Sequence, residues 1–270
     1  MIGAIIGDIV GSIYEFENHK SKDFPLFSER SAFTDDSLCT IAVAECLMAD
    51  GDPTEYLRRW GQKYWKLSSG HNYRRWLSRD TLGPYDSWGN GAAMRVSPAS
   101  FLAKSLDEAR RNAVRVTEVT HNHPEGIKGA LATTDAIWMA FEGATPETIR
   151  KHIAQTYGYD MARSVDSIRP GYQFDVSCQG TVPEAIICAL QATDFEDAIR
   201  NAVSIGGDSD TVACIAGGIA EARFGVPEAI GDEAMRRLTN ETNSVVHAMY
   251  QCRSLRRIPS LTQGDTGHAP

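Results

Sequence analysis

Residues 205–213 read Ile-Gly-Gly-Asp-Ser-Asp-Thr-Val-Ala, and an almost wholly apolar run follows them. Glycine accepts positive φ angles and lets the backbone turn sharply. After the turn, Val212, Ile215 and Ile219 recur at helical spacing, a pattern typical of a helix that packs into a core. The stretch therefore predicts a tight turn into a buried helix, with two acids and two hydroxyls at its N-terminus.

These four polar side chains exceed what the start of a helix requires. One polar residue is enough to cap a helix, and a second acid gains some free energy from the helix dipole. An elaborate N-cap accounts for only part of the set formed by Asp208, Ser209, Asp210 and Thr211. The surplus oxygen atoms indicate a hard cation.

A second stretch, Phe-Thr-Asp-Asp-Ser-Leu at residues 33–38, again places a hydroxyl and two acids before an apolar helix. If both helix N-termini meet, four carboxylates share one small space. At about 4 Å and an effective dielectric constant of about 20, each like-charged pair costs roughly 4 kcal/mol. Protons or metal ions must neutralise such a cluster. Oxygen-only ligands favour Mg, Mn or Ca over Zn, and the adjacent Asp35 and Asp36 can reach different ions, so a two-metal site is plausible.

The composition excludes several classes of protein. A formal net charge of -8 and an isoelectric point near 5.4 argue against general nucleic-acid or membrane binding. No apolar run reaches the length of about 18 residues that a membrane span needs, and the N-terminal region lacks the basic start of a signal peptide. The six cysteines show no C-x-x-C pairing. We therefore expect reduced cysteines in a cytoplasmic protein, and we expect it to be a monomer.

The remaining pattern is almost entirely helical, with scarce strand signals and no internal repeat. Glycines at positions 3, 7 and 11 share one helix face, where neighbouring backbone can come close. Capping residues or proline predict six further helix starts, at Asp52, Ser105, Pro124, Thr145, Thr181 and Thr193. Residues 17–32 are predicted to form a loop, which is a candidate flap.

Residues 68–87 are predicted to form a second loop. Three arginines in it (Arg74, Arg75 and Arg79) stand beside Tyr73 and Trp76. A basic and aromatic patch of this kind could meet a nucleotide, and a solvated surface loop is the alternative.

Three more motifs occur in the chain. They are Gly-Asp-Ile-Val-Gly at residues 7–11 with Glu15 after it, Gly-Asn-Gly-Ala-Ala-Met-Arg at 89–95, and Thr-His-Asn-His-Pro at 120–124. Together with the two acidic stretches, these motifs resemble those of the ADP-ribosylglycohydrolase family, and they occur in the same order as in that family. The matching motifs span residues 3 to 225.

The resemblance implies an all-α fold, a compact orthogonal helical domain around a central acidic dinuclear metal site. We expect one domain over residues 1–258 and a frayed tail at 259–270. The implied activity is metal-dependent hydrolysis of the N- or O-glycosidic bond at C1″ of an ADP-ribosyl group, carried by a protein or by a small conjugate. Two cations, Mg or Mn, are implied, with six oxygen ligands: Thr34, Asp35, Asp36, Asp208, Asp210 and Thr211.

The resemblance also assigns further roles. The implied catalytic residues are Glu15, Asp35, Asp36, Asp208 and Asp210. The implied substrate-binding residues are Gly89, Asn90, Gly91, His121, Gly207 and Ser209. Backbone N–H groups around Asn90 would suit a diphosphate, since they start a helix.

Two other functions stay open. The first is a catalytically inactive relative that only binds ADP-ribose, and the complete set of acids argues against it. The second is a metal-dependent phosphohydrolase that uses the same acids on a nucleotide diphosphate. Release of ADP-ribose rather than AMP would separate hydrolysis at C1″ from this second alternative.

Overall fold

The computed structural model describes the backbone of residues 1–256 and the side chains of residues 1–252. The tail predicted at 259–270 lies outside the described residues. Within residues 1–256 the chain forms fifteen helices and no strand, which confirms the all-α class. The helices are α1 (Ile2–Gly11), α2 (Asp35–Ala49), α3 (Pro53–Lys63), α4 (His71–Leu77), α5 (Gly91–Met94), α6 (Ser97–Leu102), α7 (Leu106–Thr117), α8 (Pro124–Phe141), α9 (Pro146–Tyr157), α10 (Val165–Ile168), α11 (Cys178–Gln191), α12 (Phe195–Ile205), α13 (Ser209–Phe224), α14 (Glu228–Arg236) and α15 (Asn240–Arg256).

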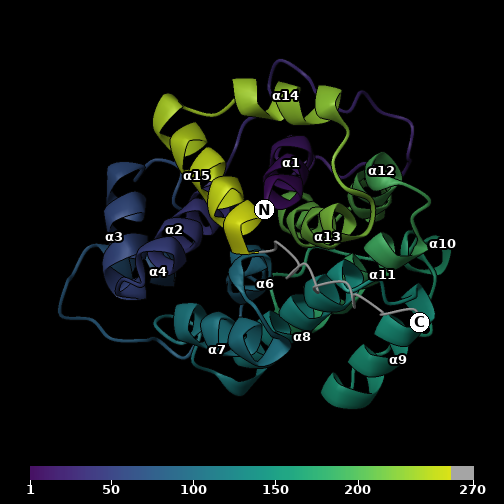
Figure 1. The fold of residues 1–270 in the computed structure, drawn as a ribbon. Coiled ribbons are helices and arrows are strands. Elements are labelled where there is room, and N and C mark those ends of the chain that lie inside the picture. Colours follow the sequence, from purple (N-terminus) through teal and green to yellow (C-terminus); the bar gives the residue numbers. More distant parts are fainter. Residues whose placement is uncertain (257–270) are drawn as a thin grey trace, which may run out of the picture.

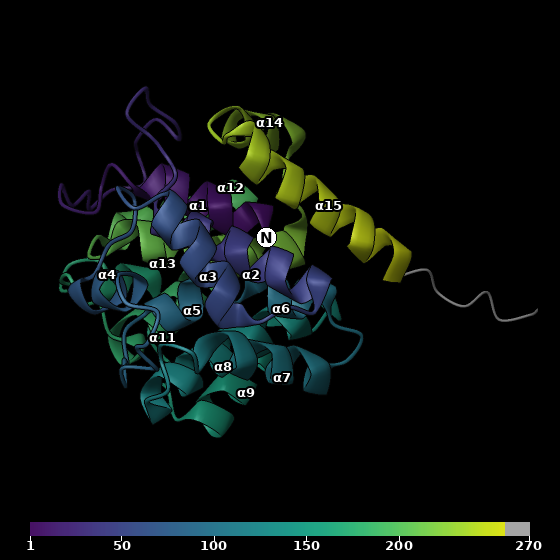
Figure 2. The ribbon, with the colours of Figure 1, turned by 90° about the vertical axis from the view of Figure 1, so that its left-hand side faces the viewer.

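Helices α1 and α13 lie together in the middle of the molecule (Figures 1 and 2). Helices α11 and α12 pack against α13 on one side, while α2, α3 and α15 lie on the other. Every residue of α13 from Ser209 to Glu221 is buried. This burial explains why the sequence of α13 is apolar and rich in alanine and glycine, because small side chains let several helices approach one axis. The polar residues at its start are therefore held inside the molecule.

The glycine face of α1 is confirmed as a site of close backbone approach. A Cβ atom on Gly7 would overlap the carbonyl group of Ala213, and one on Gly11 would lie 2.5 Å from the Cα atom of Asp210. Only glycine lets α1 lie this close to α13. The contact brings Asp8, which α1 carries between these glycines, next to the start of α13.

We expect Gly7→Ala to lower the free energy of unfolding by about 3 kcal/mol, because the added methyl group meets backbone that cannot move alone. Gly231→Ala in α14 is the matched control. A Cβ there meets only an ordinary contact at 3.6 Å, so the higher helix propensity of alanine should leave stability equal or slightly raised. Urea unfolding of both variants measures the difference, and equal stability would contradict the close packing.

Residues 68–87 are not all loop, since they include helix α4. Its Tyr73, Trp76 and Leu77 are buried, and the rings of Tyr73 and Trp76 stack with centroids 5.9 Å apart. The aromatic half of the predicted patch therefore belongs to the core. Only its basic side chains face solvent.

Two helix starts differ from the prediction. Helix α11 begins at Cys178, where the Ser177 side chain accepts a hydrogen bond from the Gly180 N–H. The Thr181 hydroxyl instead donates to the backbone carbonyl of Asp175, so it serves a loop rather than a cap. Helix α12 is capped by Asp194, one residue after the predicted start.

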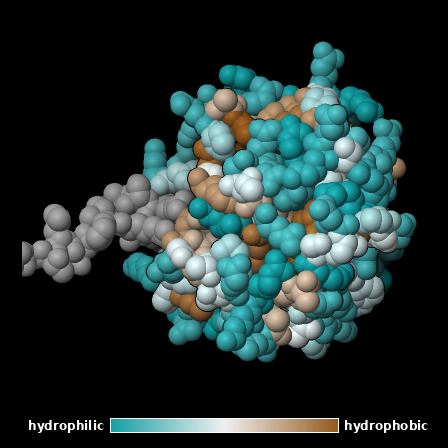
Figure 3. Space-filling model, turned by 90° about the vertical axis from the view of Figure 1, so that its right-hand side faces the viewer, coloured by the Kyte–Doolittle hydropathy of each residue, from teal (hydrophilic) through white to brown (hydrophobic). Residues whose placement is uncertain are grey.

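Residues 17–32 form no helix, as predicted. The segment is held at several points, since Lys20 Nζ donates to the Tyr172 carbonyl at 2.7 Å and Arg200 donates to the Phe24 carbonyl at 2.7 Å. On the face that carries α10 and α12, hydrophilic side chains cover most of the surface and hydrophobic ones form small separate groups (Figure 3). Within the described residues, no helix has the length and apolar character needed to cross a membrane.

Candidate active site

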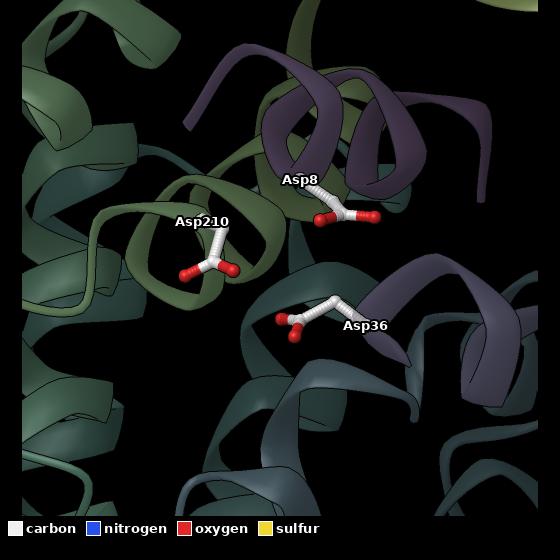
Figure 4. Close-up of side chains that lie close together, drawn as sticks. All are labelled: Asp8, Asp36 and Asp210. Carbon is white, nitrogen blue, oxygen red and sulfur yellow. The ribbon is translucent and has the colours of Figure 1, made fainter. Parts of the chain in front are cut away.

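Three helices bring their acids to one point. Asp8 from α1, Asp36 from the start of α2 and Asp210 from the start of α13 direct their carboxylates into the same space (Figure 4). One oxygen atom of each lies within 4.8 Å of the others. In a second set, formed by Glu15, Asp208 and Asp210, one oxygen atom of each residue again lies within 4.8 Å of the others. Asp210 is common to both sets, so the two could each hold one cation around a shared carboxylate.

The carboxylates of Asp36 and Asp210 are buried without adequate neutralisation. The Oδ1 atom of Asp36 has no hydrogen-bond partner in the described structure. Burial raises the pKa of Asp36 well above its usual range, and the charges of neighbouring acids raise it further; the pKa of Asp210 behaves in the same way. Because an unpaired buried carboxylate is costly, the orphaned oxygen and the all-oxygen donor set fit a hard divalent cation.

Asp8 holds the start of α2. Its carboxylate accepts hydrogen bonds from the Thr34 N–H at 2.9 Å, the Thr34 hydroxyl at 2.6 Å, the Ser37 N–H at 3.1 Å and the Ser37 hydroxyl. Burial outweighs these hydrogen bonds and raises the pKa of Asp8 to about 6. Sequence reasoning noted Asp8 in a glycine motif but assigned it no role. An acid between two core glycines on an apolar helix was the signal.

The two helix N-termini differ in how they are capped. The Thr34 hydroxyl accepts from the Asp36 N–H and so caps α2. The Asp208 side chain makes no capping hydrogen bond to α13. Its carboxylate accepts from the Asn90 side chain at 2.6 Å instead. The extra oxygens at the start of α13 are therefore not explained by capping.

A cavity of about 680 Å³ opens above the acids. All six predicted metal ligands line the cavity: Thr34, Asp35, Asp36, Asp208, Asp210 and Thr211. Asp36 and Asp210 also lie close to the buried Asp8. Asp35 accepts from the Ser69 hydroxyl at 2.9 Å. Glu15 lies at the edge of this acidic end. Burial, followed by the charges of Asp208 and other acids, raises the pKa of Glu15 to about 7.

The predicted substrate-binding residues divide into two groups. Gly89, Asn90, Gly91 and His121 line the cavity. Gly207 and Ser209 are not among its lining residues. The Gly207 N–H donates to the Asn18 side chain, and a Cβ on Gly207 would meet the Tyr172 ring. The Ser209 hydroxyl is buried and donates to the Tyr14 carbonyl at 3.3 Å.

One of the backbone N–H groups predicted to bind a diphosphate is already engaged. The Asn90 backbone N–H donates to the Val176 carbonyl at 2.7 Å, so it is not free for a phosphate. Its side-chain amide is also engaged, because it donates to Thr181 and Asp208. In this structure Asn90 positions the Asp208 carboxylate.

His121 lies against Gly91 in the cavity lining. A Cβ on Gly91 would come within 3.1 Å of His121 Nε2. Burial, followed by the nearby Arg95 guanidinium, lowers the pKa of His121 well below its usual range, so the ring is neutral at physiological pH. Arg95 and Thr120 fix the ring, since the Thr120 hydroxyl hydrogen-bonds to His121 Nδ1 at 2.8 Å and the Arg95 guanidinium donates to that hydroxyl at 2.6 Å. Both residues belong to the quoted motifs, but sequence reasoning assigned them no role.

The profile of the ADP-ribosylglycohydrolase family matches residues 1–259. The chain belongs to the ADP-ribosylglycohydrolase family. Membership supports ADP-ribosyl hydrolase activity. The match covers the acids of α2 and α13 and the lining residues described above.

The individual relatives of this chain are distant in sequence. It is 26% identical to ADP-ribosylhydrolase ARH3 of Homo sapiens, over 84% of this chain and 85% of that protein. It is also 26% identical to the ADP-ribosylarginine hydrolase Tri1 of Pseudomonas putida, over 84% of this chain and 70% of that protein. A solved ADP-ribosylglycohydrolase-related protein complex contains a chain with the same fold, at a TM-score of 0.68 and 22% identity, covering 93% of this chain and 97% of the other.

Proposed function

We propose that this protein releases ADP-ribose by hydrolysing the glycosidic bond at C1″ of an ADP-ribosyl group, with two divalent cations, Mg or Mn, bound to its acids. The observation that carries the proposal is the pair of acid sets that share Asp210 at one end of a cavity. Two cations around a common carboxylate would neutralise charges that otherwise repel one another. Family membership supports the substrate class.

The proposed ligands are the six predicted oxygen donors, which are Thr34, Asp35, Asp36, Asp208, Asp210 and Thr211. Asp8 and Glu15 lie beside them. When bound, the cations would lower the pKa of the attacking water into the neutral range. The chain itself holds these oxygens in place. Asp8 orients Thr34 by accepting a hydrogen bond from its hydroxyl group. Because that oxygen also accepts from the Asp36 N–H, one lone pair remains for a further contact.

Glu15 is the proposed acid–base residue. A carboxyl group with a pKa of about 7 can exchange a proton near neutral pH, which is the range in which general catalysis is most effective. Glu15 lines the cavity beside Asp208 and Asp35. It can therefore accept the proton of the attacking water while the bond at C1″ breaks.

We expect Glu15→Gln to lower turnover by roughly 10²-fold, since it keeps size and polarity but removes the proton acceptor. The affinity for free ADP-ribose should change much less. Glu17→Gln, assayed on a small ADP-ribose conjugate, is the matched control, because Glu17 lies two residues further along and its side chain is 71% exposed. Single-turnover kinetics and calorimetry decide between roles. Equal loss of turnover and affinity would make Glu15 a binding residue, and loss of neither would place it outside the mechanism.

The linkage and the carrier of the ADP-ribosyl group require a substrate panel. ADP-ribosyl-arginine, ADP-ribosyl-serine, poly-ADP-ribose and an acetylated ADP-ribose should be compared with Mg or Mn, with release of ADP-ribose as the readout. Formation of AMP would favour the phosphohydrolase instead. Binding of ADP-ribose without turnover on any of the four would favour the inactive relative.

We also propose a cytoplasmic protein with one domain over residues 1–258. All six cysteines are free, and five of them are buried, which suits a reducing compartment. One hydrophobic core cluster includes residues from α1 through α15, which supports a single domain. The monomer expected from the sequence stays a prediction, and light scattering would test it.

A further inference from the structure

Large apolar side chains gather in solvent at the mouth of the cavity. In the described part of the chain, the exposed large hydrophobic residues are Phe16, Trp65, Trp88, Phe174, Val176 and Phe224. Phe16, Phe174 and Val176 also line the cavity. A side chain that lines a cavity and is still largely exposed must lie where the cavity meets solvent. Trp88 directly precedes the lining residue Gly89. We call Phe16, Trp88, Phe174 and Val176 the apolar rim.

Contacts between segments that are distant in the sequence hold the apolar rim in place. The rings of Phe16 and Phe174 stack with centroids 6.1 Å apart and an interplanar angle of 25°. The Cys178 N–H donates to the Trp88 carbonyl at 3.0 Å, next to the bridge between Gly89 and Ser177. Exposed apolar side chains that the fold fixes together at a binding cavity are typical of an interaction surface.

We propose that the apolar rim is the docking surface for the polypeptide that carries the ADP-ribosyl group. This inference rests on the proposed function. A single amino acid or an acetyl group ends within a few ångströms of the broken bond, whereas a polypeptide continues across the mouth. Aromatic side chains are also enriched at contacts between proteins, and Trp is among the residues that most often dominate their binding energy.

The charges beside the rim indicate which polypeptide fits. Each rim segment carries an acid close to its apolar residue: Glu17 follows Phe16, Asp86 lies two residues before Trp88, and Asp175 separates Phe174 from Val176. An anionic polymer such as a nucleic acid needs cations along its path, and these segments offer acids instead. The surface therefore fits a polypeptide with apolar and basic side chains around the modified residue.

A second group of exposed residues at the cavity has different chemistry. Lys66 and His71 line the cavity and are exposed. Arg75 is exposed one helical turn after His71 on α4, so it lies on the same face of that helix. This basic group is where an anionic carrier would dock, and it provides a way to distinguish the two kinds of partner.

The test compares two substrates with one linkage, an ADP-ribosylated polypeptide and the same ADP-ribosyl group on the free amino acid. We expect Trp88→Ser to lower kcat/KM for the polypeptide about tenfold, mainly by raising KM. A loss of about this size is usual when an aromatic side chain is removed from an interface. Turnover of the amino-acid conjugate should be unchanged. Lysines beside the modified residue should speed cleavage of a peptide relative to glutamates.

Phe224→Ser is the matched control. Phe224 is an exposed aromatic in the last turn of α13, roughly 20 Å along that helix from Asp210, and its loss should change neither substrate. An equal loss on both substrates after Trp88→Ser, or a loss on neither, would overturn the docking role. The docking role would also be overturned if Arg75→Glu reduced cleavage of the polypeptide, Trp88→Ser did not, and cleavage depended steeply on salt concentration. That result indicates an anionic carrier.

Failure of the proposed function gives a different result. If the unaltered protein cleaves neither substrate, hydrolysis at C1″ is wrong. Calorimetry of the uncleaved ADP-ribosylated polypeptide then still tests the apolar rim. Weaker binding after Trp88→Ser, with unchanged binding of the amino-acid conjugate, would support the rim, and unchanged binding of both would overturn it.

Discussion

Replacing Asp36 by alanine is expected to reduce release of ADP-ribose by roughly 10³-fold, the scale of loss when one preorganised electrostatic group is removed from an active site. The Oδ1 atom of Asp36 has no hydrogen-bond partner and lies among other buried acids. The side chain therefore contributes repulsion to the folded state unless a cation is bound. We expect the metal-free Asp36→Ala protein to be at least as stable as the unaltered protein, while losing activity.

Asp52→Ala provides the contrast, because Asp52 caps α3 by accepting from the Thr54 N–H at 2.9 Å. Loss of that cap should cost about 1 kcal/mol of stability and leave turnover intact. Thermal unfolding with EDTA and turnover with Mn measure both variants. If Asp36→Ala behaved like Asp52→Ala, with reduced stability and near-normal activity, Asp36 would be a cap rather than part of a metal site.

Removing divalent metal is expected to abolish turnover and to make stability strongly dependent on pH. The pKa of Asp8 is raised to about 6 and that of Glu15 to about 7, and burial also raises the pKa values of Asp36 and Asp210 well above their usual range. In the unfolded chain these groups lose their protons near pH 4. Between pH 4 and pH 7 the folded state therefore binds more protons, so the stability of the metal-free protein falls as the pH rises.

Metal should reverse this fall, because cations replace the protons. Occupancy at about 100 times the dissociation constant is worth about 2.7 kcal/mol per site. We expect the difference in Tm between Mn and EDTA to be large at pH 8 and small at pH 5. The comparison needs unfolding curves at both pH values with Mg, Mn, Ca and EDTA. Equal Tm in Mn and EDTA at pH 8, with turnover unaffected by EDTA, would contradict the metal site.

Much of the local structure followed from short stretches of sequence. The starts of α3, α7, α8 and α9 lie at Asp52, Ser105, Pro124 and Thr145 as predicted, because capping and proline effects depend on residues a few positions apart. The close approach of other backbone to the glycine face of α1 was also predictable, but the structure identified α13 as the partner. The acids at the starts of α2 and α13 were recognised because their number exceeds the need for caps.

Other features were decided by tertiary contacts. Helix α4 was predicted as loop, because the basic residues between Tyr73 and Trp76 indicated an exposed segment. The burial of these two aromatic side chains depends on the surrounding helices. Thr181 looked like a cap, yet its hydroxyl donates to a loop carbonyl that only folding brings within reach.

The arrangement of the acids shows most clearly which features depend on local sequence and which depend on tertiary structure. The sequence by itself determined which helix starts carry surplus oxygen atoms. Only the tertiary structure placed Asp8 among them, made Asp210 common to two sets, turned Asn90 toward Asp208 and left Gly207 and Ser209 outside the cavity lining. Caps and helical periods arise between neighbours in the chain, whereas the sharing of a carboxylate depends on distances between helices more than a hundred residues apart, which packing of the whole core sets.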